Sequence, residues 1–483
     1  MPLTARSALA IASVAAAFLL LAFARDLKAE TLSDAIALAY QTNPTLQGQR
    51  ASQRALDETF VQAEAGYRPT IGVQAGVTTD ANNLGAFNPH NFAPGSSQSS
   101  EAVVTLNQPL YTGGLVSAQV RAARAKVLAG REQLRDVEET VLQQVIDAYV
   151  DVRRDQQGLL IDEDSLKLLE RQLIESKARF EVGEITRTDV AETEARVAGA
   201  RAQLASARAQ LAISRAAYDD VVGHDPGDLA PEPSLERLLP ASLASAYAQA
   251  EQANPQILQA DYTERSSAAQ IAAAKAQARP TLSLQGQAGY YGGNYGEVSP
   301  FVDYTHDVNA SVVLKVPIFT GGIASSQIRQ AAENNNVDRI SIEATRRKVL
   351  LTVAQAWNQL LAARANLLAD ETQVRASNIA FEGSRQEAEV GLRTTLDVLI
   401  TEQDLAAAQL ALVAARHDEY AAAAALLAAD GDLYAQDLSD VQVYDPKKNF
   451  DRVRKLVGWP LDPVISTIDE IGSPGVPSPP PGR

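Results

Sequence analysis

Apolar and polar residues alternate along four short stretches of the chain, which form two pairs. Each pair opens just after an Arg-Pro dipeptide, Arg68-Pro69 or Arg279-Pro280. A period of two places successive residues on opposite faces of a β-strand, so the pattern predicts two strand pairs joined by polar loops at 80–100 and 291–307. The apolar positions are Ile71, Val73, Ala75 and Val77 with Val104 and Leu106 in the first pair, and Leu282, Leu284 and Ala288 with Val312, Leu314 and Val316 in the second.

Two much longer stretches have a helical pattern. Residues 115–180 contain no Pro and two Gly, and residues 323–390 contain no Pro and one Gly. At about 1.5 Å per residue, each helix would reach roughly 100 Å. Apolar residues in the second stretch follow alternating steps of three and four, as in a coiled-coil seam, and the first stretch repeats them 208 positions earlier. Abundant Ala lets helices approach closely, which predicts long helices packed side by side into a sheet or tube.

The sequence indicates an internal duplication of the chain. Asn43-Pro44 and Asn254-Pro255 lie 211 positions apart, as do the two Arg-Pro dipeptides. Each copy contains a short helix, a second helix, a strand pair, a long helix and a shorter helix, and a repeat of this kind constrains the architecture more than any single element does. In chain order we predict a signal peptide at 1–24, a first structural repeat at 25–240, a second at 241–430, and an equatorial segment with a disordered Pro-rich tail at 431–483.

Each long helical stretch is interrupted once, by a Val-Gly dipeptide. Val182-Gly183 and Val390-Gly391 lie 208 positions apart, so both helices turn back at equivalent places. A Thr follows each Gly, and an Asp stands three residues after that Thr, as in a helix capping box. The pattern predicts two helical hairpins whose tips end in a left-handed Gly.

The strand pairs allow two interpretations. Strands of about ten residues with one apolar and one polar face are typical of a membrane β-barrel. A soluble sheet with one buried face shows the same alternation. Four aromatic residues near the strand ends favour the barrel, because aromatic side chains gather at the membrane interfaces: Tyr111, Tyr290, Tyr291 and Phe319.

Composition narrows the class of protein. The formal net charge of −16 gives an acidic surface that repels nucleic acid. The lack of Cys excludes disulfides, thiolate metal sites and a lipid-anchored N-terminus. An apolar run from Ala8 to Phe23 predicts a cleaved secretory signal, with an uncleaved membrane anchor as the alternative. No later segment is apolar enough to predict a membrane-spanning helix.

Neither an enzyme nor a cofactor or metal site is predicted. The four His residues are scattered, without metal-ligand spacing or a neighbouring nucleophile motif. We interpret each as a loop or surface residue, and the acidic run 162–164 as a solvated helix face. The four are His90, His224, His306 and His417.

These features together resemble one family, the TolC-like outer-membrane factors of Gram-negative bacteria. The resemblance covers roughly 30–444 and rests on the duplication, the Asn-Pro and Arg-Pro breaks, the strand ends at 108–114 and 316–322, and both Val-Gly tips. It implies a mainly α-helical fold with a small β-barrel portion. Three chains would share one trimeric, twelve-stranded barrel in the outer membrane and one α-helical tunnel through the periplasm.

The resemblance implies an exit channel that passively conducts substrates out of the cell. The implied partners are two further copies of the chain, a periplasmic adaptor protein, an inner-membrane pump of the RND, ABC or MFS type, and outer-membrane lipid. Efflux of drugs or small molecules and type I secretion of proteins both remain open. The alternative is a non-channel exported coiled-coil or adaptor protein, although an adaptor would need a lipoyl-like β-domain on either side of a single hairpin.

The resemblance also places a periplasmic gate at the tips. Arg393 matches a linking Arg, Thr188 and Asp189 match its partners, and Asp397 matches an acidic ring position. Two departures, Ala388 for a linking Tyr and Ile400 for a second ring Asp, imply fewer links. Capping of the helices is the alternative role of both Asp residues. Adaptor hairpins would contact Val182, Gly183, Val390, Gly391 and Leu392.

Overall fold

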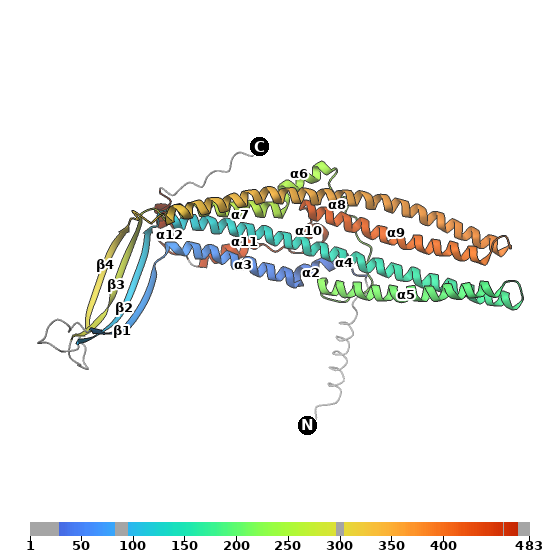
Figure 1. Ribbon diagram of the computed structural model, residues 1–483, viewed down its shortest axis with the longest axis horizontal. Coiled ribbons are helices and arrows are strands. Elements are labelled where there is room, and N and C mark those ends of the chain that lie inside the picture. The colour runs from blue at the N-terminus through green and yellow to red at the C-terminus, as the bar shows by residue number, and fades with distance from the viewer. Residues whose placement is uncertain (1–28, 83–94, 296–303, 457, 472–483) are drawn as a thin grey trace, which may run out of the picture.

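The structure, a computed structural model, describes residues 29–82, 95–295, 304–456 and 458–471 (Figure 1). The molecule is elongated, with a small sheet at one end and two helical hairpins reaching the other. The predicted signal peptide, the Pro-rich tail from 472 onward and the middle of both polar loops lie outside the described residues.

The two halves of the chain contain the same elements in the same order, which confirms the predicted duplication. The first half contains α2 (Leu32–Thr42), α3 (Pro44–Glu64), η1 (Ala65–Tyr67), β1 (Thr70–Asn82), β2 (Gly95–Tyr111), α4 (Leu115–Glu181) and α5 (Arg187–Val222). The second half contains α6 (Leu243–Ala253), α7 (Pro255–Ala276), β3 (Thr281–Tyr295), β4 (Tyr304–Lys315), α8 (Ile323–Glu389) and α9 (Thr395–Asp430). α4 and α8 are both 67 residues long, and α5 and α9 are both 36.

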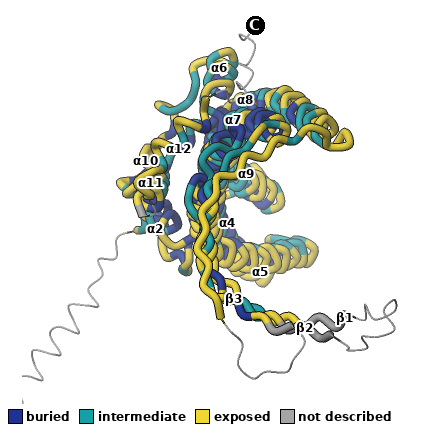
Figure 2. Tube along the Cα trace, turned by 90° about the vertical axis from the view of Figure 1, so that its left-hand side faces the viewer, coloured by how far each residue is buried: buried dark blue, intermediate teal, exposed yellow. Residues whose placement is uncertain are grey.

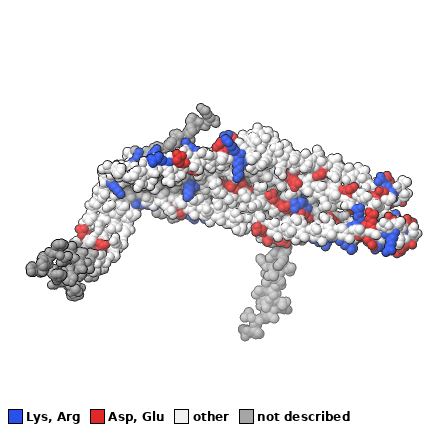
Figure 3. All heavy atoms as spheres, viewed as in Figure 1, with Lys and Arg blue, Asp and Glu red and all other residues white. Residues whose placement is uncertain are grey.

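The four strands form one antiparallel sheet in the order β1-β2-β3-β4. Val73 pairs with Val104, and Val104 with Ala288, so the predicted apolar residues share one face. That face is open to the surroundings, since the side chains of Ile71 and Val73 are 73% and 77% exposed. Figure 3 shows an almost uncharged surface over the strands, whereas charged side chains gather at the far ends of the hairpins. An exposed apolar face of this kind suits lipid contact.

The strands are longer than predicted. They extend into the polar loops, with β1 ending at Asn82, β2 beginning at Gly95 and β4 beginning at Tyr304. Backbone pairing between adjacent strands continues through Ser, Thr and Asn as well as through apolar residues, so polarity alone did not mark the ends. Tyr291 lies on the polar face, where the amide of Gln287 donates to its hydroxyl, and not in an outward aromatic girdle.

The Asn-Pro breaks join the short helices to the hairpins in the same way in both halves. Asn43 caps α3 through its side-chain oxygen, and its amide donates to the Val221 carbonyl at 2.9 Å. Asn254 caps α7, and its amide donates to the Ala429 carbonyl at 3.0 Å. Each Asn therefore ties the start of one helix to the last turn of α5 or α9, next to the central apolar core.

One helix is more apolar than the sequence prediction allowed. α9 is long and apolar enough to cross a membrane, by length and composition alone. Much of that apolarity comes from Ala, and α9 packs between α8 and α4. The prediction that no segment after the leader reaches this threshold was wrong.

The C-terminal region, predicted as an equatorial segment with a disordered tail, contains three short helices among the described residues: α10 (Ala435–Leu438), α11 (Pro446–Leu456) and α12 (Asp462–Glu470). α11 packs on α3. α12 packs at the foot of β2, where α4 begins. Viewed along the long axis, the helices curve around a concave side, and α10–α12 lie on the opposite, convex side (Figure 2).

Candidate functional site: the hairpin tips and the concave face

Both tips turn back through the same backbone hydrogen bonds. In the first tip the amide of Glu184 donates to the Arg179 carbonyl, and the amide of Gly183 to the Phe180 carbonyl. The second tip repeats this pair of bonds from Leu392 and Gly391. This is a Schellman motif, which needs a left-handed residue after the helix. Gly183 and Gly391 supply it with φ angles of 80° and 78°.

A capping box starts the returning helix in both tips. The Asp397 carboxylate accepts from the Thr394 hydroxyl at 2.7 Å and from the Thr394 amide at 3.0 Å. Asp189 accepts from Thr186 in the same way, at 2.8 Å for both bonds. These hydrogen bonds to Thr394 and Thr186 stabilise the ionised carboxylates and lower the pKa of each Asp below its usual value. Both groups are thus anionic at neutral pH and serve as helix caps within one chain.

The structure brings only part of the predicted gate together. The Arg393 guanidinium donates to Glu387 of its own hairpin at 2.5 Å. Thr188 and Asp189 lie at the other tip. A single chain therefore shows Arg393 held by its own tip, and the link to Thr188 and Asp189 stays a prediction about neighbouring hairpins.

The two hairpins meet along a seam between α4, α5 and α9. Near the tips, Leu169, Val197 and Leu399 form a small buried cluster. One turn further from the tips, Glu402 is buried and accepts from the Ser165 hydroxyl at 2.7 Å. Burial raises the pKa of Glu402. Near the tips, the hairpin of the second repeat is thus attached to α4 of the first by a few apolar contacts and one buried carboxylate.

A cavity of about 190 Å³ lies beside this seam. Its wall includes Ala388, Phe381 and Leu399, together with Arg385 and Glu402. Ala388 is the position where the family resemblance places a linking Tyr. The methyl group of Ala388 leaves this space unfilled in one chain, and the smaller number of links stays a prediction about neighbouring hairpins.

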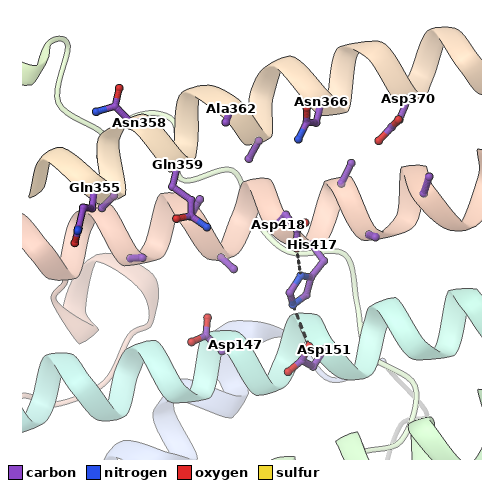
Figure 4. Close-up of a pocket in the computed structure, with 18 of the residues that line it drawn as sticks. Asp147, Asp151, Gln355, Asn358, Gln359, Ala362, Asn366, Asp370, His417 and Asp418 are labelled. Carbon is purple, nitrogen blue, oxygen red and sulfur yellow. Dashed lines mark hydrogen bonds and ion pairs between the residues drawn. The ribbon is translucent and has the colours of Figure 1, made fainter. Parts of the chain in front are cut away.

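A larger cleft of about 1400 Å³ opens on the concave face (Figure 4). Ala residues of α9 form its floor, because α9 lies between α4 and α8. Its walls carry carboxylate and amide side chains, and the imidazole of His417 from α9 lies among them: Gln143, Asp147 and Asp151 from α4, and Gln355, Asn358, Gln359, Asn366 and Asp370 from α8. The wall of the cleft is therefore polar and carries several carboxylates.

His417 joins α9 to α4 across this cleft (Figure 4). Its Nε2 lies 3.0 Å from Asp151 and its Nδ1 lies 2.9 Å from Asp418. Burial, which lowers the pKa of His417, is outweighed by these hydrogen bonds, so its pKa is raised. The bond from His417 lowers the pKa of Asp151, whereas burial and the charge of Asp151 raise the pKa of Asp147 to about 6.

Comparison with known proteins identifies the family. The family model described as outer membrane efflux protein matches residues 35–224 and 246–432. The chain belongs to this family. It is 35% identical over 436 residues to the outer membrane efflux protein BepC of Brucella suis, covering 88% of this chain and 91% of BepC. It is 28% identical over 420 residues to the outer membrane protein TolC of Vibrio cholerae, covering 86% and 93% of the two chains.

Solved structures support the same fold. The Campylobacter jejuni CmeC outer membrane channel superposes with a TM-score of 0.74 at 14% identity, covering 88% of this chain and 90% of CmeC. As an outer membrane efflux protein, the chain lies in the outer membrane with its helical hairpins directed into the periplasm. CmeC is described as an outer membrane channel, and BepC as an outer membrane efflux protein.

Sequence reasoning missed the contacts between the two hairpins of this efflux protein. His417 was interpreted as a surface residue, but its side chain is only 16% exposed and paired with α4. Asp162, assigned to a solvated face, is buried, and burial raises its pKa. Helical periodicity could have identified the buried Glu402, because it lies three and four residues after Leu399 and Val398, on the same buried face of α9.

Proposed function

We propose that three copies of this chain close into one outer-membrane exit channel, with a twelve-stranded barrel continued by a tunnel of hairpins. The observation that carries this proposal is the open sheet. β1 and β4 are edge strands of 13 and 12 residues in one chain. An open strand edge within lipid leaves backbone groups unsatisfied, whereas a closed barrel has no edge. The exposed apolar face then meets lipid and the polar face lines the pore.

Native mass spectrometry of the detergent-purified protein tests this assembly. The proposal predicts a trimer that persists when the protein is diluted and that dissociates on heating. A monomer with no pore activity would favour the alternative, a non-channel exported coiled-coil or adaptor protein.

The proposed gate consists of Thr188, Asp189, Arg393 and Asp397. Arg393 would exchange its bond to Glu387 for a link to Thr188 and Asp189 of an adjacent hairpin when three chains assemble. Three copies of Asp397 would then meet near the axis. At a separation of about 6 Å, each pair of carboxylates repels by roughly 0.7 kcal/mol in bulk water and by more at lower dielectric. The ring would favour cations.

Single-channel recording separates gating from capping. Arg393→Ser should raise the conductance of the closed state, and unchanged conductance would remove Arg393 from the gate. A capping box accepts Gln at this position, so Asp397→Gln preserves the cap but removes the charge. Reduced cation selectivity in Asp397→Gln supports the ring, and wild-type selectivity would leave Asp397 as a cap alone.

The tips are the proposed contact surface for a periplasmic adaptor. Val182, Val390 and Leu392 are 71%, 71% and 78% exposed beside the two left-handed Gly residues. Glu184 stands where the second tip has Leu392, so the second tip offers the more apolar surface. Leu392→Asp should weaken adaptor cross-linking more than Val182→Asp, and equal effects would contradict this ranking.

The pump and the cargo lie beyond this chain. BepC is described as an efflux protein, and we propose that the present chain serves an efflux or type I secretion system with an RND, ABC or MFS pump. Deletion of its gene, followed by a drug-susceptibility panel and a comparison of secreted proteins, decides between the two. Unchanged results in both assays would contradict an exit-duct function.

A further inference from the structure

The C-terminal helix α12 is attached to the protein by polar contacts. Asp469 is fully buried, and its carboxylate accepts from the amides of Thr112 and Gly114 at 2.6 and 3.2 Å. It also accepts from the Ser117 amide at 3.3 Å. Asp462 pairs with Arg68 at 3.1 Å. These bonds fix α12 against the N-terminus of α4, directly below β2.

The exposed side of α12 carries an apolar stripe. Its residues recur at steps of three, four and three, so they lie along one side of the helix. Together with Trp459, which precedes the helix, we name them the α12 stripe. They are Leu461, Val464, Ile468 and Ile471, with exposed fractions of 48%, 55%, 41% and 68%, and Trp459, with 42%. A soluble surface helix normally shows the reverse arrangement, with apolar residues inward.

The position of α12 identifies what covers this stripe. Gln108 lies in register with Leu284 on the apolar face of the sheet, and its amide donates to the Tyr67 carbonyl at 2.8 Å. Tyr67 in turn packs against Ile465 of α12. α12 therefore lies at the foot of the strands on the side that faces lipid, and on the convex side of the molecule (Figure 2).

The preceding helix adds a matching charge. α11 carries five basic residues and one acidic residue, and the basic ones are all exposed: Lys447, Lys448, Arg452, Arg454 and Lys455. Its apolar contacts point inward, with the rings of Phe450 and Phe60 at 4.9 Å. A basic segment next to an apolar stripe with a Trp is the pattern of a helix that lies in the membrane interface, because anionic headgroups attract Lys and Arg while Trp prefers the headgroup boundary.

We propose that α12 is an interfacial membrane helix, whose stripe is buried in the periplasmic leaflet of the outer membrane. The basic residues of α11 that lie nearest α12 contact anionic phospholipid headgroups. The segment would form a collar at the foot of the barrel and fix the depth of the strands in the bilayer. This inference rests on the membrane-embedded sheet but not on the gate, the adaptor or the cargo.

The two Trp residues allow a direct test on the full-length protein. Trp357 lies in α8, 34 residues from the start of the helix, or about 50 Å along its axis. Trp357→Phe leaves Trp459 as the only Trp, and Trp459→Phe leaves Trp357 as a matched control. Each variant is reconstituted into phosphatidylethanolamine and phosphatidylglycerol vesicles, with and without phosphatidylcholine that carries brominated acyl chains.

Brominated lipid should quench most of the Trp459 emission and leave the Trp357 emission unchanged. Ile468→Lys should reduce the quenching of Trp459, whereas Asp451→Lys on the exposed face of α11 should not. Blue-shifted Trp459 emission without quenching would mean that protein, such as a second copy, covers the stripe, and would overturn the proposal. Solvent-like emission without quenching would overturn it as well. Pore conductance of the same vesicles reports insertion of the sheet separately, so a failed channel is distinguishable from a failed collar.

Discussion

The contact between Asp469 and the start of α4 makes the sharpest prediction about stability. Asp469 is fully buried and accepts hydrogen bonds from three backbone amides and from the Thr112 hydroxyl at 2.8 Å. The Ser117 amide belongs to the first turn of α4, where no carbonyl within the helix can accept from it, and the amides of Thr112 and Gly114 lie in the turn that leads into the helix. Asp469→Ala removes all four bonds, and only the Thr112 hydroxyl, which accepts from the Val116 amide at 3.1 Å, still caps the turn.

The expected cost follows from typical values. A lost N-terminal cap costs about 0.5–2 kcal/mol, and a hydrogen bond to a charged group contributes about 1.5–3 kcal/mol. Because the bonds share one carboxylate, their contributions do not simply add, and we expect Asp469→Ala to reduce local stability by about 3 kcal/mol in total. Asp469→Asn keeps one acceptor oxygen and should cost roughly half as much. The loss should be local, because α12 is a peripheral helix.

Hydrogen exchange with mass spectrometry measures this effect. A local loss of about 3 kcal/mol speeds amide exchange by about 100-fold, since every 1.4 kcal/mol is a factor of ten. Exchange should rise in peptides that cover 112–117, whereas the equivalent segment 320–325 at the start of α8 should not change. Wild-type exchange at 112–117 in Asp469→Ala would refute the assigned role of Asp469.

Three further predictions concern the helices. Burial, with a smaller contribution from a neighbouring acid, raises the pKa of Asp430 to about 7, so the folded protein holds this proton more tightly than the unfolded chain does. The contribution of Asp430 to stability should be greatest at acidic pH and be lost as pH rises through 7, so Asp430→Asn should lessen the loss of stability between pH 5.5 and pH 8.5 in thermal melts; an equal loss in wild type and variant would contradict it. The raised pKa of His417 means that its bond to Asp151 stabilises the fold below about pH 6.5 and is lost as pH rises through the folded-state pKa. His417→Gln should therefore lower the melting temperature at pH 6 but not at pH 9, and an equal loss at both would reject an ionic bond. Gly391→Ala should lower the free energy of unfolding by about 1–2 kcal/mol through left-handed backbone strain alone. Gly431→Ala should lower it more, because the new Cβ would also lie 2.8 Å from the Asn254 backbone. Gly431→Ala should therefore have the lower melting temperature, and equal melting temperatures would contradict the packing argument.

The duplication and the tips could be predicted because they depend on local signals. Pro and Gly stop helices, Thr and Asp three residues apart cap them, and both copies carry these residues at the same offset. The structure confirms the capping boxes at Asp189 and Asp397 and the left-handed Gly183 and Gly391. Residues that interact with their own neighbours in sequence leave a pattern that can be read directly.

The C-terminal helices and the seam could not be predicted because their residues depend on distant partners. Asp469 binds the start of α4 more than 350 residues earlier in the chain. The stripe on α12 points away from the protein, so its apolar pattern gives no indication of a packed core. His417 and Asp151 lie in different repeats, and nothing in either local sequence shows that α9 and α4 meet there.

The central claim is that the open sheets of three chains close into one pore. Single-channel recording of the purified wild-type protein in planar bilayers tests it most directly, with polymers of increasing size added to probe the width of the pore. The account predicts discrete, long-lived and cation-selective conductance steps that small polymers reduce and large polymers do not. Bilayer binding without conductance steps would contradict it.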